Sequence, residues 1–167
     1  THLTVAASKT ATLSAAQAAL DVTLGNNAVA KAKVLTTADI SGTTFDSNVT
    51  HLTVAASKTA TLSAAQAQLD VTLGNSAVAK LGIGANTDVS SLNLDSDLTE
   101  FVVTSGTLTV STTQASGRTI SGSGNVTVNA LATNADLSNV SASGTITANI
   151  AATGDYSANS NVSTVDA

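Results

Sequence analysis

The sequence predicts an all-β fold: an elongated parallel β-solenoid of ~16-residue coils, three in each repeat. Three observations predict it. The chain repeats itself, its strand-like segments are short and alternate apolar with hydroxyl residues, and it has almost no large side chains. Only Phe45, Phe101 and Tyr156 are aromatic, and Trp, Met, Cys and Pro are absent. An interior of Val, Leu, Ile and Ala therefore suits thin layers of stacked strands.

The repeat has a period of 49 residues. Residues 1–31 recur at 50–80 with only two differences, and residues 38–49 correspond to 87–98 with more differences but with apolar positions kept apolar. A period this clear indicates a solenoid or another repeat architecture. We expect one continuous solenoid of three repeats, at 1–49, 50–98 and 99–162, followed by the start of a further repeat at 163–167.

The third repeat is about 16 residues longer than the others, which predicts one extra coil inserted without breaking the stack. Short strands such as TLTVS (107–111) are separated by Gly and Asn clusters such as SGSGN (121–125). Such clusters mark turns at close intervals. The 43% hydrophobic fraction argues against a disordered chain.

The SAAQ corners leave two alternatives open. Ser14 and Ser63 each begin a Ser-x-x-Gln sequence, the spacing of a helix capping box, and helix-forming residues follow. The third copy keeps Ser111 but places two threonines before its glutamine, and threonine favours strand. A helical turn is therefore an alternative at these corners, and a β-corner is preferred.

Charge and composition exclude several partners. The net charge of −5 disfavours nucleic acid and anionic membranes, which bind clustered cations. No run approaches the ~20 apolar residues of a membrane-spanning helix, so no membrane insertion is expected. The chain begins at Thr1 within the repeating pattern, and we expect it to be part of a longer protein.

The segments TLTVSTTQASGRTISGSGNVTV (107–128) and DLSNVSASGTITANIAATGDYSAN (136–159) resemble the Thr/Ala/Ser-rich tandem repeats of large bacterial secreted surface proteins. These include adhesin-like proteins and components of S-layers and extracellular filaments. The resemblance covers essentially the whole chain and implies an extracellular place on the bacterial cell surface. It implies no mechanism, because its motifs are compositional.

Five carboxylates are the only metal candidates. Asp39, Asp88 and Asp136 are equivalent in the three repeats, and Asp46 and Asp95 follow the first two by seven residues. Carboxylate oxygens at turns are calcium ligands. Sparse carboxylates favour the alternative that these side chains cap turns. No other cofactor is expected.

No catalytic residues are expected. His2 and His51 are one position in two copies, the third copy has Glu100 there, and no other histidine exists. A His-based metal site or catalytic dyad is therefore not expected, and neither are the clustered acids of a glycoside hydrolase. The sequence indicates that the protein is not an enzyme.

The favoured function is structural: self-association into a filament, sheath or layer through repeated surfaces and open strand edges. The first alternative is a spacer or binding module of a giant adhesin, with a surface glycan or another cell as a further partner. The second is an ice-binding solenoid, because Thr-x-Thr occurs at 10–12, 59–61, 107–109 and 145–147. Stacking of these threonines on one face would favour that function.

Overall fold

The computed structural model describes residues 1–133, 135–150 and 161–166, and Tyr156 lies outside them. Within them the chain is nearly all β, with parallel sheets stacked as a β-solenoid of about eight turns and very little helix. The predicted fold class is confirmed. The chain divides into two compact units: Thr1–Leu81 with Leu94–Leu98, and Gly82–Asn93 with Thr99–Ala167.

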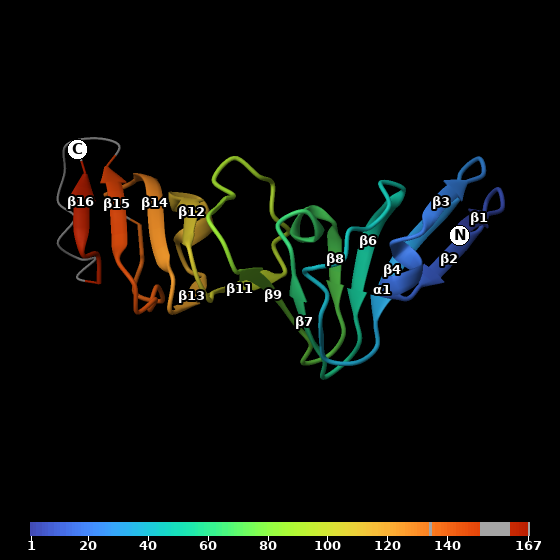
Figure 1. The fold of residues 1–167 in the computed structure, drawn as a ribbon, viewed down its shortest axis with the longest axis horizontal. Helices are drawn as coiled ribbons and strands as arrows, with labels where there is room; N and C mark the ends of the chain where they lie inside the picture. The colour runs from blue at the N-terminus through green and yellow to red at the C-terminus, as the bar shows by residue number, and fades with distance from the viewer. Residues whose placement is uncertain (134, 151–160, 167) are drawn as a thin grey trace. The chain divides into compact units, whose positions relative to one another are not determined.

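In the first unit the chain alternates between two sets of parallel strands (Figure 1). The even-numbered strands form one sheet in the order β2-β4-β6-β8: Thr10–Leu13, Val29–Val34, Val49–Val54 and Asp70–Leu73. The odd-numbered strands are β1 (His2–Val5) paired with β3 (Asp21–Leu24), and β7 (Thr59–Leu62) paired with both β5 (Ala38–Asp39) and β9 (Val78–Ile83).

Each turn of the solenoid contains more residues than predicted. His2 pairs with Asp21, which lies 19 positions later in the chain, and Thr10 pairs with Val29 at the same separation. The ~16-residue coil and the division of each repeat into three coils are therefore wrong. They assumed that a repeat contains a whole number of turns.

Each of the first two repeats contains an odd number of strands. Five strands, β1 to β5, precede β6, which starts the next copy. Because one turn uses two strands, a repeat makes two and a half turns. Identical segments consequently lie in different sheets: TATL of β2 pairs with β4, and TATL of β7 pairs with β5 and β9.

The core consists of the thin aliphatic layers that the composition predicts. Side chains along β4 alternate between half-buried and buried, as successive residues of a strand must. Its inward residues Ala30, Ala32 and Val34 are at most 4% exposed. Leu52 of β6 and Val71 of β8 extend the same layer, at 0% and 4% exposed. Small side chains let successive turns stack closely.

The Ser-x-x-Gln corners are helical, so the preference for a β-corner is wrong. They form α1 (Ala15–Ala18), the 3-10 turn η1 (Gln66–Gln68) and α2 (Thr112–Ala115). In α2 the Ser111 side chain accepts from the Gln114 backbone, and the Gln114 side chain accepts from the Ser111 backbone. This reciprocal capping box outweighs the strand preference of the intervening threonines.

The second unit continues the same construction. Its larger sheet has the order β10-β12-β14-β15-β16: Thr87–Asp88, Thr107–Ser111, Asn125–Leu131, Ile146–Ile150 and Thr164–Asp166. β14, β15 and β16 lie side by side in Figure 1. In the odd-numbered sheet, β11 (Leu98–Val103) pairs with β13 (Thr119–Gly122).

The extra coil predicted for the third repeat stays a prediction. Thr147 of β15 pairs with Thr164 of β16. Residues 151–160 of this predicted extra coil lie outside the described residues.

Candidate functional site

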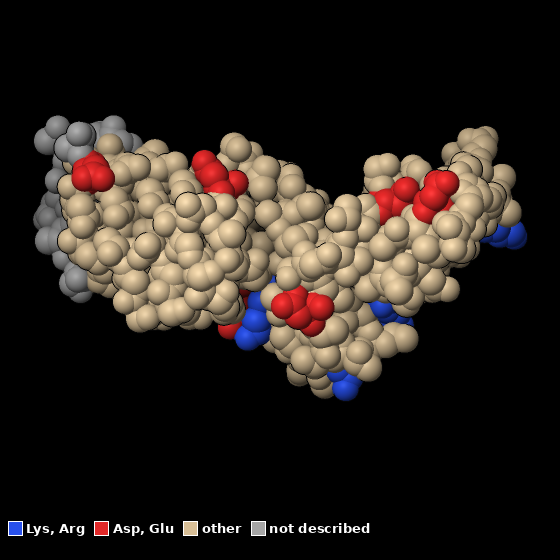
Figure 2. Space-filling view, viewed as in Figure 1, with Lys and Arg blue, Asp and Glu red and all other residues tan. Residues whose placement is uncertain are grey.

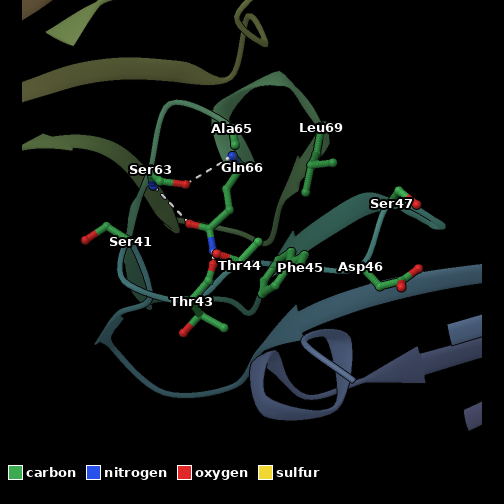
Figure 3. Close-up of a pocket in the computed structure, with 10 residues that line it drawn as sticks. All are labelled: Ser41, Thr43, Thr44, Phe45, Asp46, Ser47, Ser63, Ala65, Gln66 and Leu69. Atoms are coloured by element: carbon green, nitrogen blue, oxygen red, sulfur yellow. Dashed lines mark hydrogen bonds between the residues drawn. The ribbon is translucent and has the colours of Figure 1, made fainter. Parts of the chain in front are cut away.

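A pocket of about 430 Å³ lies at one corner of the first unit. Two segments line it: residues 41–47, the loop after β5, and residues 63–69, the helical corner between β7 and β8. Figure 3 shows Ser63 at one end of the pocket, Asp46 at the other and Phe45 between them. The lining combines an aromatic ring and short aliphatic side chains with several hydroxyl groups.

Gln66 fixes the two pocket segments against each other. Its Oε1 accepts from the Ser63 backbone N–H at 2.9 Å, which is half of the capping box. Its Nε2 donates to Ile40 O at 2.9 Å and to Thr43 O at 2.7 Å, both in the loop of the preceding turn. The side chain is only 2% exposed, so its amide satisfies backbone groups that water reaches poorly.

The second unit repeats this arrangement. Gln114 is 7% exposed and donates to Val89 O at 2.7 Å and Leu92 O at 2.9 Å. Gln17, the equivalent residue in the first turn, is exposed, and its Nε2 donates no hydrogen bond to any described residue. The sequence suggested only a local cap for these glutamines. The retention of the glutamine in the divergent third copy is the signal for the second role of Gln66 and Gln114.

The three equivalent aspartates cap turns. Asp39 Oδ1 accepts from the Ser41 hydroxyl at 2.6 Å and the Ser41 backbone at 2.9 Å, and Asp88 has the same two contacts with Ser90. Asp136 accepts from the Ser138 backbone at 2.9 Å. Serine side-chain and backbone hydrogen bonds lower the pKa of all three carboxyl groups, because they favour the charged form.

Asp46 and Asp95 also cap turns. The backbone N–H two residues later donates to Oδ1 of each at 2.9 Å. The Asp95 Oδ2 additionally accepts from the Val71 backbone at 3.2 Å. Among the described residues, no three His, Cys, Asp or Glu side chains lie close enough to hold a metal ion. Figure 2 shows the acidic groups as separate spots on the visible face.

The coil register brings each histidine beside an aspartate. His2 Nδ1 lies 3.0 Å from Asp21 Oδ2, and His51 Nε2 lies 3.3 Å from Asp70 Oδ2. The sequence did not predict these pairs, because they depend on the true length of the turn. His2 Nε2 also lies 3.0 Å from Thr4 Oγ1, a hydroxyl–imidazole–carboxylate chain. The side chains of His2 and Asp21 are 50% and 73% exposed on a strand face. Nucleophilic catalysis by a hydroxyl, an imidazole and a carboxylate needs a site enclosed from water, which this open face does not provide.

A row of threonines crosses the larger sheet of the second unit. The pairing register places four of them next to one another, on β12, β14, β15 and β16: Thr109, Thr127, Thr147 and Thr164. We call these four residues the threonine row. On β12, β14 and β15 the residues on either side of these threonines, such as Val126 and Val128, are buried, so the threonines face outward. On β16 Thr164 and both of its neighbours are exposed.

The other Thr-x-Thr sequences are not stacked in this way. Thr10 and Thr12 of β2 lie beside Val29 and Lys31 of β4. Thr61 of β7 lies between Asp39 and Lys80.

Among the described residues, no helix has both the length and the apolar character that crossing a membrane requires. Comparisons with protein-family models, with curated proteins and with solved structures find no significant match. The fold and its surfaces therefore define the chain by architecture: it is a repeat protein of the parallel β-solenoid class.

Proposed function

We propose that this chain is a structural repeat protein of the bacterial cell surface or extracellular matrix, which associates with copies of itself into a filament, sheath or layer. The observation that supports it is the parallel strand pairing between successive turns. In the first unit's even sheet, β2, β4 and β6 each pair in parallel with the strand one turn later. An outermost strand offers the same row of backbone donors and acceptors to another molecule.

The composition supports a scaffold rather than a catalyst. Asp39 and Asp88 are engaged in turn caps, and the buried glutamines join neighbouring turns. These contacts stabilise a stack without creating a reactive group. The Thr/Ala/Ser-rich repeats resemble those of large secreted surface proteins, which supports the extracellular location.

Analytical ultracentrifugation and negative-stain electron microscopy over a range of protein concentrations test this proposal. Regular fibres or sheets that grow with concentration are the expected result. A monomer at every concentration would exclude self-assembly and favour the alternative function, a spacer within a giant adhesin.

The threonine row favours a second candidate function, ice binding. Stacked strands place its hydroxyls at the ~4.8 Å strand spacing. Thr107 of β12, and Thr145 immediately before β15, add hydroxyls two residues earlier in the chain than Thr109 and Thr147. A regular grid of methyl and hydroxyl groups can order water. The chain is then expected to inhibit ice recrystallisation.

Thr127→Gln tests the second candidate, because its longer side chain would protrude from the middle of the row. Thr12→Gln is the matched control, since Thr12 lies beside Lys31 and not beside another threonine. Inhibition of recrystallisation should be lost in the first variant and kept in the second. Equal inhibition by both variants, or none by the unaltered chain, would exclude the threonine row as an ice-binding face.

A further inference from the structure

The pocket of the first unit contains polar groups that the fold does not use. The Gln66 amide and the Ser63 hydroxyl are engaged within the corner. The hydroxyls of Thr43, Thr44 and Ser47 make no hydrogen bond with any described residue. These hydroxyls therefore remain available as donors and acceptors beside a partly apolar surface.

The apolar part of the pocket is Phe45, with Leu69 and Ala65 (Figure 3). Phe45 is half-buried, although it is one of only two phenylalanines in a chain short of large side chains for its core. Phe101, the other one, is fully buried at 0% exposed. An aromatic ring left partly open in a pocket offers a flat apolar face to a ligand.

The two repeats keep the frame of this corner and change its lining. Positions 46, 63 and 66 are Asp, Ser and Gln in the first corner and in its equivalent one repeat later. Thr43, Thr44 and Phe45, in contrast, correspond to Leu92, Asn93 and Leu94. One repeat later the corner therefore lacks the aromatic ring and the two threonine hydroxyls, within a segment, 38–49 against 87–98, that also differs at other positions.

The chemistry of the lining selects the ligand. Among the described residues, no Lys, Arg or His lines the pocket, so it offers no cation to bind an anion. Its volume of about 430 Å³ falls within the usual range of small-molecule sites and is large enough for one or two sugar rings. A sugar has an apolar C–H face that stacks on an aromatic ring and hydroxyls that pair with other hydroxyls.

We propose that the pocket between residues 41–47 and 63–69 binds one or two residues of a neutral glycan, with Phe45 as the stacking platform. This site is independent of self-assembly: it lies at a corner, and its lining residues belong to the turns rather than to the paired edges of strands. The filament proposal and this one can therefore fail separately.

The test is a ¹H–¹⁵N NMR titration of the whole chain with four neutral disaccharides: maltose, cellobiose, lactose and N,N′-diacetylchitobiose. At least one should shift the amide signals of 41–47 and 63–69, with a Kd on the order of 1 mM, as expected for a small open site. Phe45→Leu gives this corner the residue that its twin has at position 94, so it should fold normally and bind at least about tenfold more weakly. Leu94→Ala, the matched control, should bind as the unaltered chain does.

Three results would overturn the proposal. One is the absence of local shifts with all four sugars at about 20 mM, well above the expected Kd. Another is binding that survives Phe45→Leu unchanged. The third is selective binding of tetramethylammonium, which would identify Phe45 and Asp46 as a cation site instead.

Discussion

Gln66→Ala is the substitution that tests how neighbouring turns are held together. It removes two hydrogen bonds to the loop of the preceding turn, at 2.9 and 2.7 Å, and one within the helical corner, at 2.9 Å. A hydrogen bond contributes a net ~1 kcal/mol, and a buried group left unpaired costs at least that much. We therefore expect the free energy of unfolding to fall by about 3 kcal/mol.

Gln17→Ala is the internal control, because Gln17 has the same local sequence but lies exposed in the first turn. It makes only the local contacts with Ser14. Its replacement should cost no more than about 1 kcal/mol, so the two variants should differ by about 2 kcal/mol. That difference isolates the two hydrogen bonds between turns.

Urea unfolding followed by far-ultraviolet circular dichroism measures both free energies. Stacked repeats can unfold in steps, so hydrogen exchange of the amides around Ser63 provides a local second measurement. Equal losses in Gln17→Ala and Gln66→Ala would refute the role of Gln66 between turns. Gln66→Glu sharpens the test: a carboxylate cannot donate to the two carbonyls, so it should destabilise at least as much as alanine.

Three further outcomes are expected. Val22→Asp together with Val71→Asp should abolish the folded circular dichroism spectrum, because these side chains are 1% and 4% exposed and an unpaired charge would enter the apolar layer; unchanged melting would contradict this. Ser41→Ala should raise the pKa of Asp39 toward its ordinary value in a carboxyl NMR titration, because the serine hydrogen bonds lower it. The native interaction stabilises the fold fully above the unfolded pKa of about 3.9, and this stabilisation is lost as the pH falls through the lower folded pKa. An unaltered titration would disprove the assignment. Gly122→Ala should destabilise by more than about 1 kcal/mol in urea unfolding, because this residue has a φ of +115° and an added Cβ would overlap Val103 O.

Gly117→Ala is the control for the glycine prediction. Gly117 also has a positive φ, +73°, but an added Cβ would meet nothing within 4 Å. Only the backbone strain would remain, so this variant should lose less stability than Gly122→Ala. The reverse order would show that close approach of the backbone is not what requires glycine at 122.

The sequence predicted the solenoid correctly because its two main signals are local. A repeated segment and alternating apolar residues can be recognised without knowing what lies beside them. Val22 and Val71 could be placed in the core for the same reason, and both are buried. The turn-capping alternative for Asp39 is also local, because the capping serine is only two residues away.

The features that the sequence did not predict depend on the register between turns. Gln66 finds its carbonyl partners 23 and 26 residues earlier, and His2 finds Asp21 one turn later. An even division of the repeat into three coils gave the wrong turn length, so neither neighbour could be identified. The lining of the pocket likewise combines segments of two successive turns, 41–47 and 63–69, which only the register brings together.

Because each repeat has an odd number of strands, the sheet on which later residues lie depends on whether the number of preceding repeats is odd or even. Inserting one more copy of the repeat would carry the residues that follow it half a turn around the coil, so that side chains displayed on one sheet would be displayed on the opposite one. Inserting two would restore the original orientation. Duplication or deletion of a single copy can therefore reverse the side on which later residues are presented while leaving the strand pairing intact.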